Sequence, residues 1–178
     1  MKGIIFNLVE DVVTQENGPD AWDDLLDAAH VDGAYTAVGS YDDKQLLSIV
    51  DAAASAGGLP PDDVMRHVGR QSLLLLAERF PEFFELHSSV RTFLPTLNSV
   101  IHPEVRKLYP GARPPHFDFS EGPDDTILMD YHSERTMCPM AEGLTLGAGD
   151  YFGETLAITQ TQCTKHGAPH CTLRIAVE

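Results

Sequence analysis

The sequence predicts an α+β fold, in which a helical N-terminal part packs on a C-terminal part with an antiparallel sheet and helices. Up to about residue 110, apolar residues recur every three or four positions, which is the period of a helix with one buried face. The segment 110–115, PGARPP, cannot continue a helix and predicts a rigid connector. Beyond it, residues 126–134 alternate between apolar and polar side chains, as a half-buried strand does.

Helices are expected throughout the part that precedes the connector. Pro61-Asp62-Asp63 and Asp42-Asp43 favour helix starts, because a first turn accepts proline and is stabilised by acidic side chains. A stripe of apolar residues runs from Val90 to Leu108, and Pro95 within it predicts a kink or two abutting helices. The earlier helices are expected at 2–15, 20–29, 42–56 and 61–79.

The part after the connector mixes strands with one helix. The alternating segment 126–134 predicts the first strand, and residues 141–152 predict a helix in spite of their three glycines. Two further strands are expected at 155–162 and 171–177, joined by a turn around Gly167.

Charge and composition restrict the classes of function. The 178 residues include 27 acidic and 12 basic side chains, a formal charge of −15, which disfavours nucleic acid or anionic membrane as a partner. No apolar run reaches the ~18 residues that span a bilayer, and the N-terminus lacks the pattern of a signal peptide. An odd number of cysteines, three, disfavours a disulfide framework. We therefore expect a soluble cytoplasmic protein that meets small molecules or other proteins.

Arg135 continues the buried row of the strand at 126–134, in line with Tyr131 and Ser133. A guanidinium on a buried face needs an anion, and a carboxylate is its bidentate match, with the phenol and the hydroxyl as two further donors. The alternative is that Arg135 extends to solvent or pairs with an aspartate of the protein.

His102 lies beside the apolar stripe and is the second candidate. A neutral imidazole there can bind a metal or a haem iron. Val105 and Arg106 occupy the positions one turn later, so no second ligand is at hand, which favours haem over a bare zinc ion. The alternative is an ordinary surface or hydrogen-bonded histidine.

These residues together resemble the H-NOX family, the haem nitric oxide/oxygen binding domains. The resemblance rests on His102-Pro103, on Pro115, and on the Y-x-S-x-R element from Tyr131 to Arg135. The stretches 1–5, MKGII, and 68–71, VGRQ, are also similar to the family, so that the match covers essentially the whole chain.

The resemblance implies a cofactor and roles for these residues. It implies one haem-binding domain over residues 1–178, with a helical distal subdomain at about 1–60, a proximal subdomain at about 61–178, and haem b buried between them. His102 would be the iron ligand, while Tyr131, Ser133 and Arg135 would hold the propionates. Ile5 and Pro115 would press on the porphyrin.

The gas that such a site selects depends on the opposite, distal side of the haem. Oxygen-binding members of the family have a tyrosine five residues after the Arg of the motif, and this sequence has Met140 there. Val9 and the run 73–76, which includes Leu74, are also apolar, and Ser72 is the single hydroxyl nearby. Bound oxygen needs a hydrogen-bond donor, whereas nitric oxide and carbon monoxide do not, so an apolar pocket predicts selection against oxygen.

Three cysteines remain, at positions 138, 163 and 171. Nitric oxide-sensing members of the family resemble this pattern with a zinc held by three cysteines and a histidine. Gln160 occupies the family's histidine position, so His166 is the preferred fourth ligand, with His170 the other choice. Three free thiols are the alternative.

The leading interpretation is a haem-based nitric oxide sensor. Nitric oxide would weaken the bond between iron and His102, and the helix carrying His102 would shift against the Tyr131–Arg135 strand. The family implies a histidine kinase or a cyclic-di-GMP enzyme as the protein partner. No motif pairs a nucleophile with a base, so enzymatic activity is not expected. The alternatives are a zinc/thiol redox sensor built on the three cysteines, and a small-molecule binding module without iron.

Overall fold

The computed structural model describes all 178 residues and contains seven α-helices and four strands. The N-terminal helices are α1 (Gly3–Asn17), α2 (Asp20–Ala29), α3 (Asp43–Gly57) and α4 (Pro61–Arg79). Two short helices follow, α5 (Val90–Phe93) and α6 (His102–Leu108), and a longer one, α7 (Cys138–Phe152), lies in the C-terminal part. The strands are β1 (His116–Glu121), β2 (Ile127–His132), β3 (Leu156–Gln162) and β4 (Cys171–Val177).

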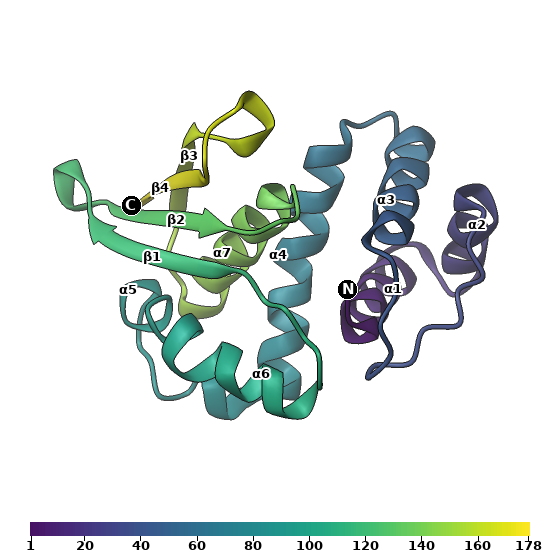
Figure 1. Cartoon of the computed structure of the whole chain (residues 1–178), viewed down its shortest axis with the longest axis horizontal. Coiled ribbons are helices and arrows are strands. Elements are labelled where there is room, and N and C mark those ends of the chain that lie inside the picture. The colour runs from purple at the N-terminus through teal and green to yellow at the C-terminus, as the bar shows by residue number, and fades with distance from the viewer.

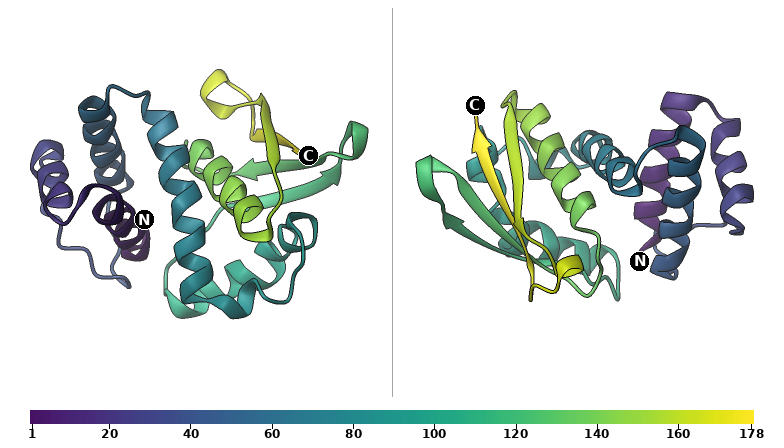
Figure 2. Two further views of the ribbon diagram at one scale, coloured as in Figure 1. Left: turned by 180° about the vertical axis from the view of Figure 1, so that it is seen from behind. Right: turned by 90° about the horizontal axis from the view of Figure 1, so that it is seen from above.

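Helix α4 lies between the other N-terminal helices and the sheet (Figures 1 and 2). Its residues contribute to both hydrophobic cores of the molecule: Met65, Val68 and Leu75 join the core of α1 to α3. Leu73 and Ala77 join the core beneath the sheet. The two cores therefore meet along one helix. No helix is both long and apolar enough to cross a membrane.

The sheet is antiparallel throughout, in the strand order β1-β2-β4-β3. Ile127, Met129 and Tyr131 of β2 are buried, and the residues between them are half-buried, which confirms the predicted alternation. Strand β1 was not predicted. It has only Phe117 and Phe119 as apolar residues, too few to show a period beside the proline connector. Register places His116 opposite His132, so the strand begins directly after Pro115.

The apolar stripe from Val90 to Leu108 forms two helices, as the position of Pro95 predicted. Helix α5 ends at Phe93, and a π-helical turn over Leu97–Ile101 leads directly into α6 at His102. The side chain of Asn98 fixes this turn to β1, because its amide donates to the carbonyl of Phe117 and its Oδ1 accepts from the Phe117 N–H at 3.2 Å. Two hydrogen bonds thus hold the π-helical turn against β1.

Helix α7 begins at Cys138, three residues before the predicted start, and its glycines have a packing role. A Cβ on Gly143 would lie 2.0 Å from the carbonyl oxygen of Arg66, and one on Gly147 would lie 2.4 Å from that of Arg70. These glycines therefore let α7 approach the backbone of α4 more closely than any other residue allows.

Candidate functional site

A buried cavity of about 320 Å³ lies between the N-terminal helices and the proximal elements. Its walls come from α1, α4, α6, α7, the connector and the sheet, and 24 of its 32 lining residues are hydrophobic. An apolar cavity with few polar groups is suited to a largely apolar ligand that those groups orient. The polar lining includes His102, Tyr131, Ser133 and Arg135, so the structure brings these four sequence-predicted residues to one cavity.

His102 is the first residue of α6 and lies directly after the π-helical turn. Its ring packs 5.8 Å from the ring of Phe117, and its Nδ1 atom is buried without a hydrogen-bond partner. Burial lowers the pKa of His102 to about 4, and the charge of Arg106 acts in the same direction, while a contact with the Pro115 backbone opposes them. The imidazole is therefore neutral at pH 7, the form in which histidine binds metals.

Tyr131, Ser133 and Arg135 follow one another around the end of β2. The Arg135 N–H donates to the Ser133 hydroxyl at 3.1 Å, and the Tyr131 hydroxyl donates to the Arg135 carbonyl at 3.4 Å. Burial raises the pKa of Tyr131, which keeps its proton available for donation. The three residues thus form one local unit at the edge of the cavity.

The guanidinium of Arg135 also has partners in the protein. Its Nε donates to Asp43 Oδ2 at 2.6 Å, and its Nη1 donates to the Arg113 carbonyl at 2.8 Å, whereas Nη2 makes no hydrogen bond. The pairing with an aspartate of the protein, the alternative drawn from the sequence, is thus present. Three donors of the five on a guanidinium remain for another anion.

Asp43 also pairs with a second cation, the N-terminal amine of Met1, whose nitrogen lies 2.6 Å from Asp43 Oδ1. Burial by itself raises the pKa of Asp43, but the amine and Arg135 outweigh it and lower the pKa below the ordinary value. The pairing of Asp43 with Arg135 could not be predicted, because the two residues are 92 positions apart in the sequence. Asp43 also stands at a helix start, where an acidic residue already has a local explanation.

Three of the remaining residues predicted for the walls lie at the cavity. Ile5, Pro115 and Met140 line it. Leu74 does not: it is half-buried on another side of α4, and Leu73 and Leu76, three residues apart on one face, line the cavity instead.

The predictions for Val9 and Ser72 are also corrected. Both are buried in the protein and do not line the cavity. Helix α7 contributes a hydroxyl to the lining through Thr145, whose Oγ1 donates to the Ala141 carbonyl at 2.8 Å. Thr145 lies four residues after Ala141 and so shares its face of α7, a spacing that the predicted helix at 141–152 already contained.

The donor set of the cavity fits haem. A buried imidazole nitrogen without a partner fits an iron ligand, and a guanidinium with free donors beside a phenol and a hydroxyl fits carboxylates. The surrounding apolar walls fit the faces of a macrocycle.

The three cysteines meet at a second site. Cys138, Cys163 and Cys171 are all buried, and their sulfur atoms lie within 4.8 Å of one another, with 3.7 Å between Cys138 and Cys163. Burial raises the pKa of Cys138 to about 12. Burial also acts to raise that of Cys171, but hydrogen bonds from the Thr164 backbone and hydroxyl lower it overall. The cluster thus contains one thiol that resists ionisation and one that favours it.

His166 does not join this cluster. It is exposed in the turn between β3 and β4, outside the group of sulfur atoms, so its role as a fourth ligand stays a prediction. The side chain of Gln160 acts to lower the pKa of Cys138, although burial outweighs it. His170 contacts the Gln162 amide at 2.7 Å, away from the sulfur atoms.

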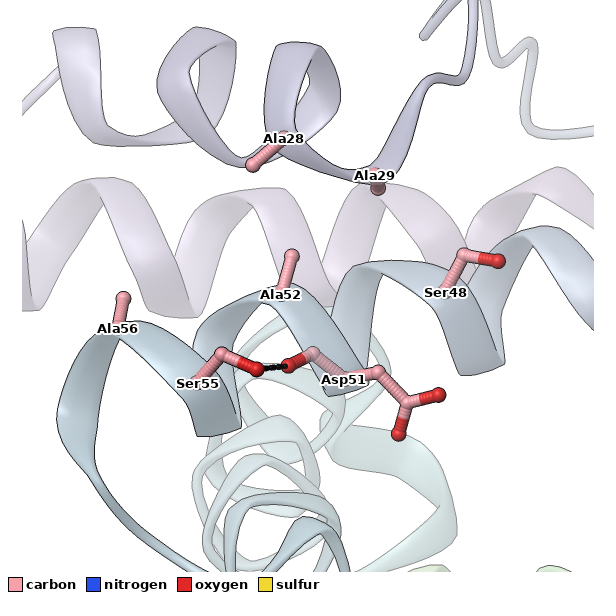
Figure 3. Close-up of a pocket in the computed structure, with 7 residues that line it drawn as sticks. All are labelled: Ala28, Ala29, Ser48, Asp51, Ala52, Ser55 and Ala56. Carbon is pink, nitrogen blue, oxygen red and sulfur yellow. Dashed lines mark hydrogen bonds between the residues drawn. The ribbon is translucent and has the colours of Figure 1, made fainter.

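A depression also lies between α2 and α3, and Figure 3 shows its small side chains. Ser55 donates its hydroxyl proton to the Asp51 carbonyl at 2.8 Å, so that this polar group is satisfied within α3. The depression is open to solvent and offers no unpartnered buried polar group, in contrast to the cavity beside His102.

Comparisons with known proteins agree with this geometry. A family model described as haem-NO-binding matches residues 2–160. An H-NOX protein from Shewanella oneidensis, solved in the Fe(II)NO ligation state, is 34% identical with a TM-score of 0.92 and covers 100% of this chain and 99% of that chain. The same identity and coverage, with a TM-score of 0.89, hold for an NMR structure from that organism in the Fe(II)CO state. An H-NOX protein from K. algicida, at 24% identity, 100% and 97% coverage and a TM-score of 0.86, shares the fold.

Proposed function

Because the chain belongs to the H-NOX family of haem-based gas sensors, we propose that it is a nitric oxide sensor in which His102 holds a ferrous haem b. The observation that carries the proposal is the neutral, buried imidazole of His102, with an unpartnered ring nitrogen, at an apolar cavity. When bound, haem supplies an iron that takes a diatomic gas as ligand.

The end of β2 supplies the anchor for the propionates. Tyr131 and the free donors of Arg135 face the cavity, and the Ser133 hydroxyl fixes the turn that presents them. Charge-assisted hydrogen bonds to a carboxylate are about twice as strong as neutral ones, so Arg135 would contribute most. Ile5 on α1 and Pro115 in the connector support the apolar faces from two sides.

Selection against oxygen follows from the hydrogen bonds of the wall. Met140 carries no donor, and the Thr145 hydroxyl already donates its single proton to the Ala141 carbonyl. Nitric oxide and carbon monoxide do not need such a donor, and the Shewanella relative has been solved in Fe(II)NO and Fe(II)CO ligation states. We expect the ferrous protein to remain unligated in air and to bind both gases.

Signal output would start at α6. His102 is its first residue, and Asn98 ties the preceding turn to β1, so a displacement of His102 is transmitted to both elements. A ligand shifts such an equilibrium only when it favours one of the two arrangements. We infer that a separate protein, a histidine kinase or a cyclic-di-GMP enzyme, reads this displacement.

The test of the haem assignment is His102→Gly. The variant should carry little haem, and imidazole added during growth should restore it, because the small ligand takes the place of the missing side chain. The control is His67→Ala, which removes an exposed histidine and should retain full haem. Alanine is used there because glycine would weaken helix α4. Full loading of His102→Gly without imidazole would overturn the assignment.

The thiol cluster supports a second candidate, a zinc/thiol redox sensor. Three buried sulfur atoms within 4.8 Å supply three ligands of a tetrahedral zinc site, with the fourth outside the cysteine group. Metal analysis of purified protein should then show about one zinc that Cys163→Ser releases. If only haem iron is found, the thiols are free.

A further inference from the structure

The outer face of the sheet carries a group of titratable side chains that the haem cavity does not use. Register pairs His116 with His132 and Asp118 with Asp130 across strands β1 and β2. Side chains on a strand alternate between faces, and the residues between these, Phe117 and Tyr131, point into the core. Two histidines and two aspartates thus share the face that α7 does not cover (Figure 2).

The carboxylate of Asp118 lies between the two imidazoles. Its Oδ1 is 3.1 Å from His116 Nε2, and its Oδ2 is 3.0 Å from His132 Nε2. Three groups that commonly bind transition metals therefore lie beside one another. His116 and Asp118 come from the start of β1 and His132 ends β2, so the pairing of the two strands fixes the backbone that carries them.

The aspartates of this group form no ion pair with a permanently charged side chain. The ion pairs of Asp118 are made only with histidines, and no lysine or arginine side chain pairs with Asp118 or Asp130. The Nε2 of His132 is buried and makes no hydrogen bond, because its approach to Asp118 is close but poorly aligned. A ring nitrogen without a hydrogen bond next to an uncompensated carboxylate suits a cation.

We propose that His116, Asp118 and His132 form a binding site for a divalent transition-metal ion of the zinc or nickel type. Two imidazole nitrogens and one carboxylate oxygen are the ligands that such ions take, with water completing the coordination. The two imidazole rings lie 6.1 Å apart between centroids, so the site closes by rotation about the side-chain bonds of His116 and Asp118, which are 61% and 64% exposed.

His170 acts as a positioning residue behind this site. Its ring lies 4.7 Å from that of His132 at an interplanar angle of 37°, and contacts to Gln162 at 2.7 Å and Asp130 at 3.4 Å hold it there. Packing against a held ring limits the orientations of His132 and so reduces the ordering that metal binding requires.

The proposed site is separate from the cysteine cluster. Cys171 pairs with Tyr131 across the sheet and is fully buried in the core, whereas His132, the next residue along β2, points to the opposite face. The site also adjoins the haem cavity, because His116 follows Pro115 and His132 stands between Tyr131 and Ser133. A bound ion would link the two strands where they leave the cavity and stabilise the native state by mass action.

Calorimetric titration of the haem-loaded protein with NiCl₂, without an affinity tag, tests the proposal. We expect about one equivalent to bind, and His116→Gln, His132→Gln and Asp118→Asn each to weaken binding at least tenfold. His170→Gln should weaken it less, since that residue only orients His132. His30→Asn is the matched control: His30 is exposed, and its left-handed backbone, at φ 56°, tolerates asparagine.

Titration with CoCl₂ distinguishes this site from the thiols, because a thiolate ligand adds intense near-ultraviolet absorption that nitrogen and oxygen ligands do not. The expected spectrum lacks that absorption, and Cys163→Ser leaves nickel binding unchanged. Absence of nickel binding, equal affinity in the wild type and the His116→Gln variant, or loss of binding in Cys163→Ser would each overturn the proposal. Circular dichroism of every variant verifies that it is folded.

Discussion

The contact between α4 and α7 makes Gly143→Ala a sharp test of the structure. The added Cβ would lie 2.0 Å from the Arg66 carbonyl oxygen, and an ordinary contact begins near 3.4 Å, so the two helices must separate locally by about 1.4 Å. Overpacking of this kind costs about 1–3 kcal/mol, and a backbone carbonyl cannot rotate away as a side chain can. The gain in helix propensity, about 1 kcal/mol, offsets part of the cost.

We therefore expect Gly143→Ala to lower the free energy of unfolding by about 1 kcal/mol, which corresponds to a fall in Tm of roughly 2–4 °C for a domain of this size. Helix α7 also carries Met140 and Leu144 of the cavity wall, so haem should be lost faster from the variant.

Gly57→Ala is the matched control, because its Cβ would meet nothing closer than 3.5 Å at the end of α3. It should leave the free energy of unfolding unchanged or slightly higher. Equal Tm values for the Gly143→Ala variant, the control and the wild type, measured by thermal unfolding of the haem-loaded proteins, would refute the close helix packing.

Three further predictions concern the cavity. Arg135→Ala should release haem to apomyoglobin about 10–100-fold faster, the equivalent of about 1.5–3 kcal/mol for one charge-assisted contact. Arg174→Ala, which removes an exposed arginine of β4 outside the cavity lining, should not. The pKa of Asp43 is lowered in the folded state, so its contribution to stability is present at neutral pH and is lost as the pH falls below about 4. Urea unfolding of wild type and Asp43→Asn should therefore show a difference in the free energy of unfolding that decreases in that pH range. Met140→Tyr should raise oxygen affinity by about one to two decades, seen as an oxy spectrum in air, and an unchanged spectrum would show that the phenol does not reach the ligand.

The elements that could be predicted from the sequence are those in which a pattern of apolar residues repeats several times. The apolar stripes of α1 to α4 and the alternation of β2 each repeat often enough to define a buried face. Strand β1, with two inward aromatic residues, does not. Helix α7 was predicted in spite of its three glycines, which lower helix propensity. The contact with α4 that explains these glycines is one that no local pattern displays.

The site was predictable where chemistry alone demands a partner. A cation on a buried row of β2 required an anion, and this identified Arg135 as a site residue without a structure. The identity of the anion was not predictable from the strand, because Asp43 comes from α3, 92 residues away. The family resemblance pointed to the apolar run 73–76 with Leu74 as the wall of the cavity, whereas the rotation of α4 places Leu73 and Leu76 there.

The two sequence interpretations of Arg135, a partner for a ligand carboxylate and a partner for a protein aspartate, are compatible. Asp43 uses Nε and the Arg113 carbonyl uses Nη1, which leaves Nη2 for another anion. Asp43 stands at the start of α3 and also binds the amine of Met1, next to α1. One guanidinium therefore joins the N-terminal helices to the end of β2, and a carboxylate bound at Nη2 would share its charge with Asp43. Any ligand that pulls Arg135 toward the cavity would thereby weaken its contact with α3, which couples occupancy of the cavity to the position of the N-terminal helices.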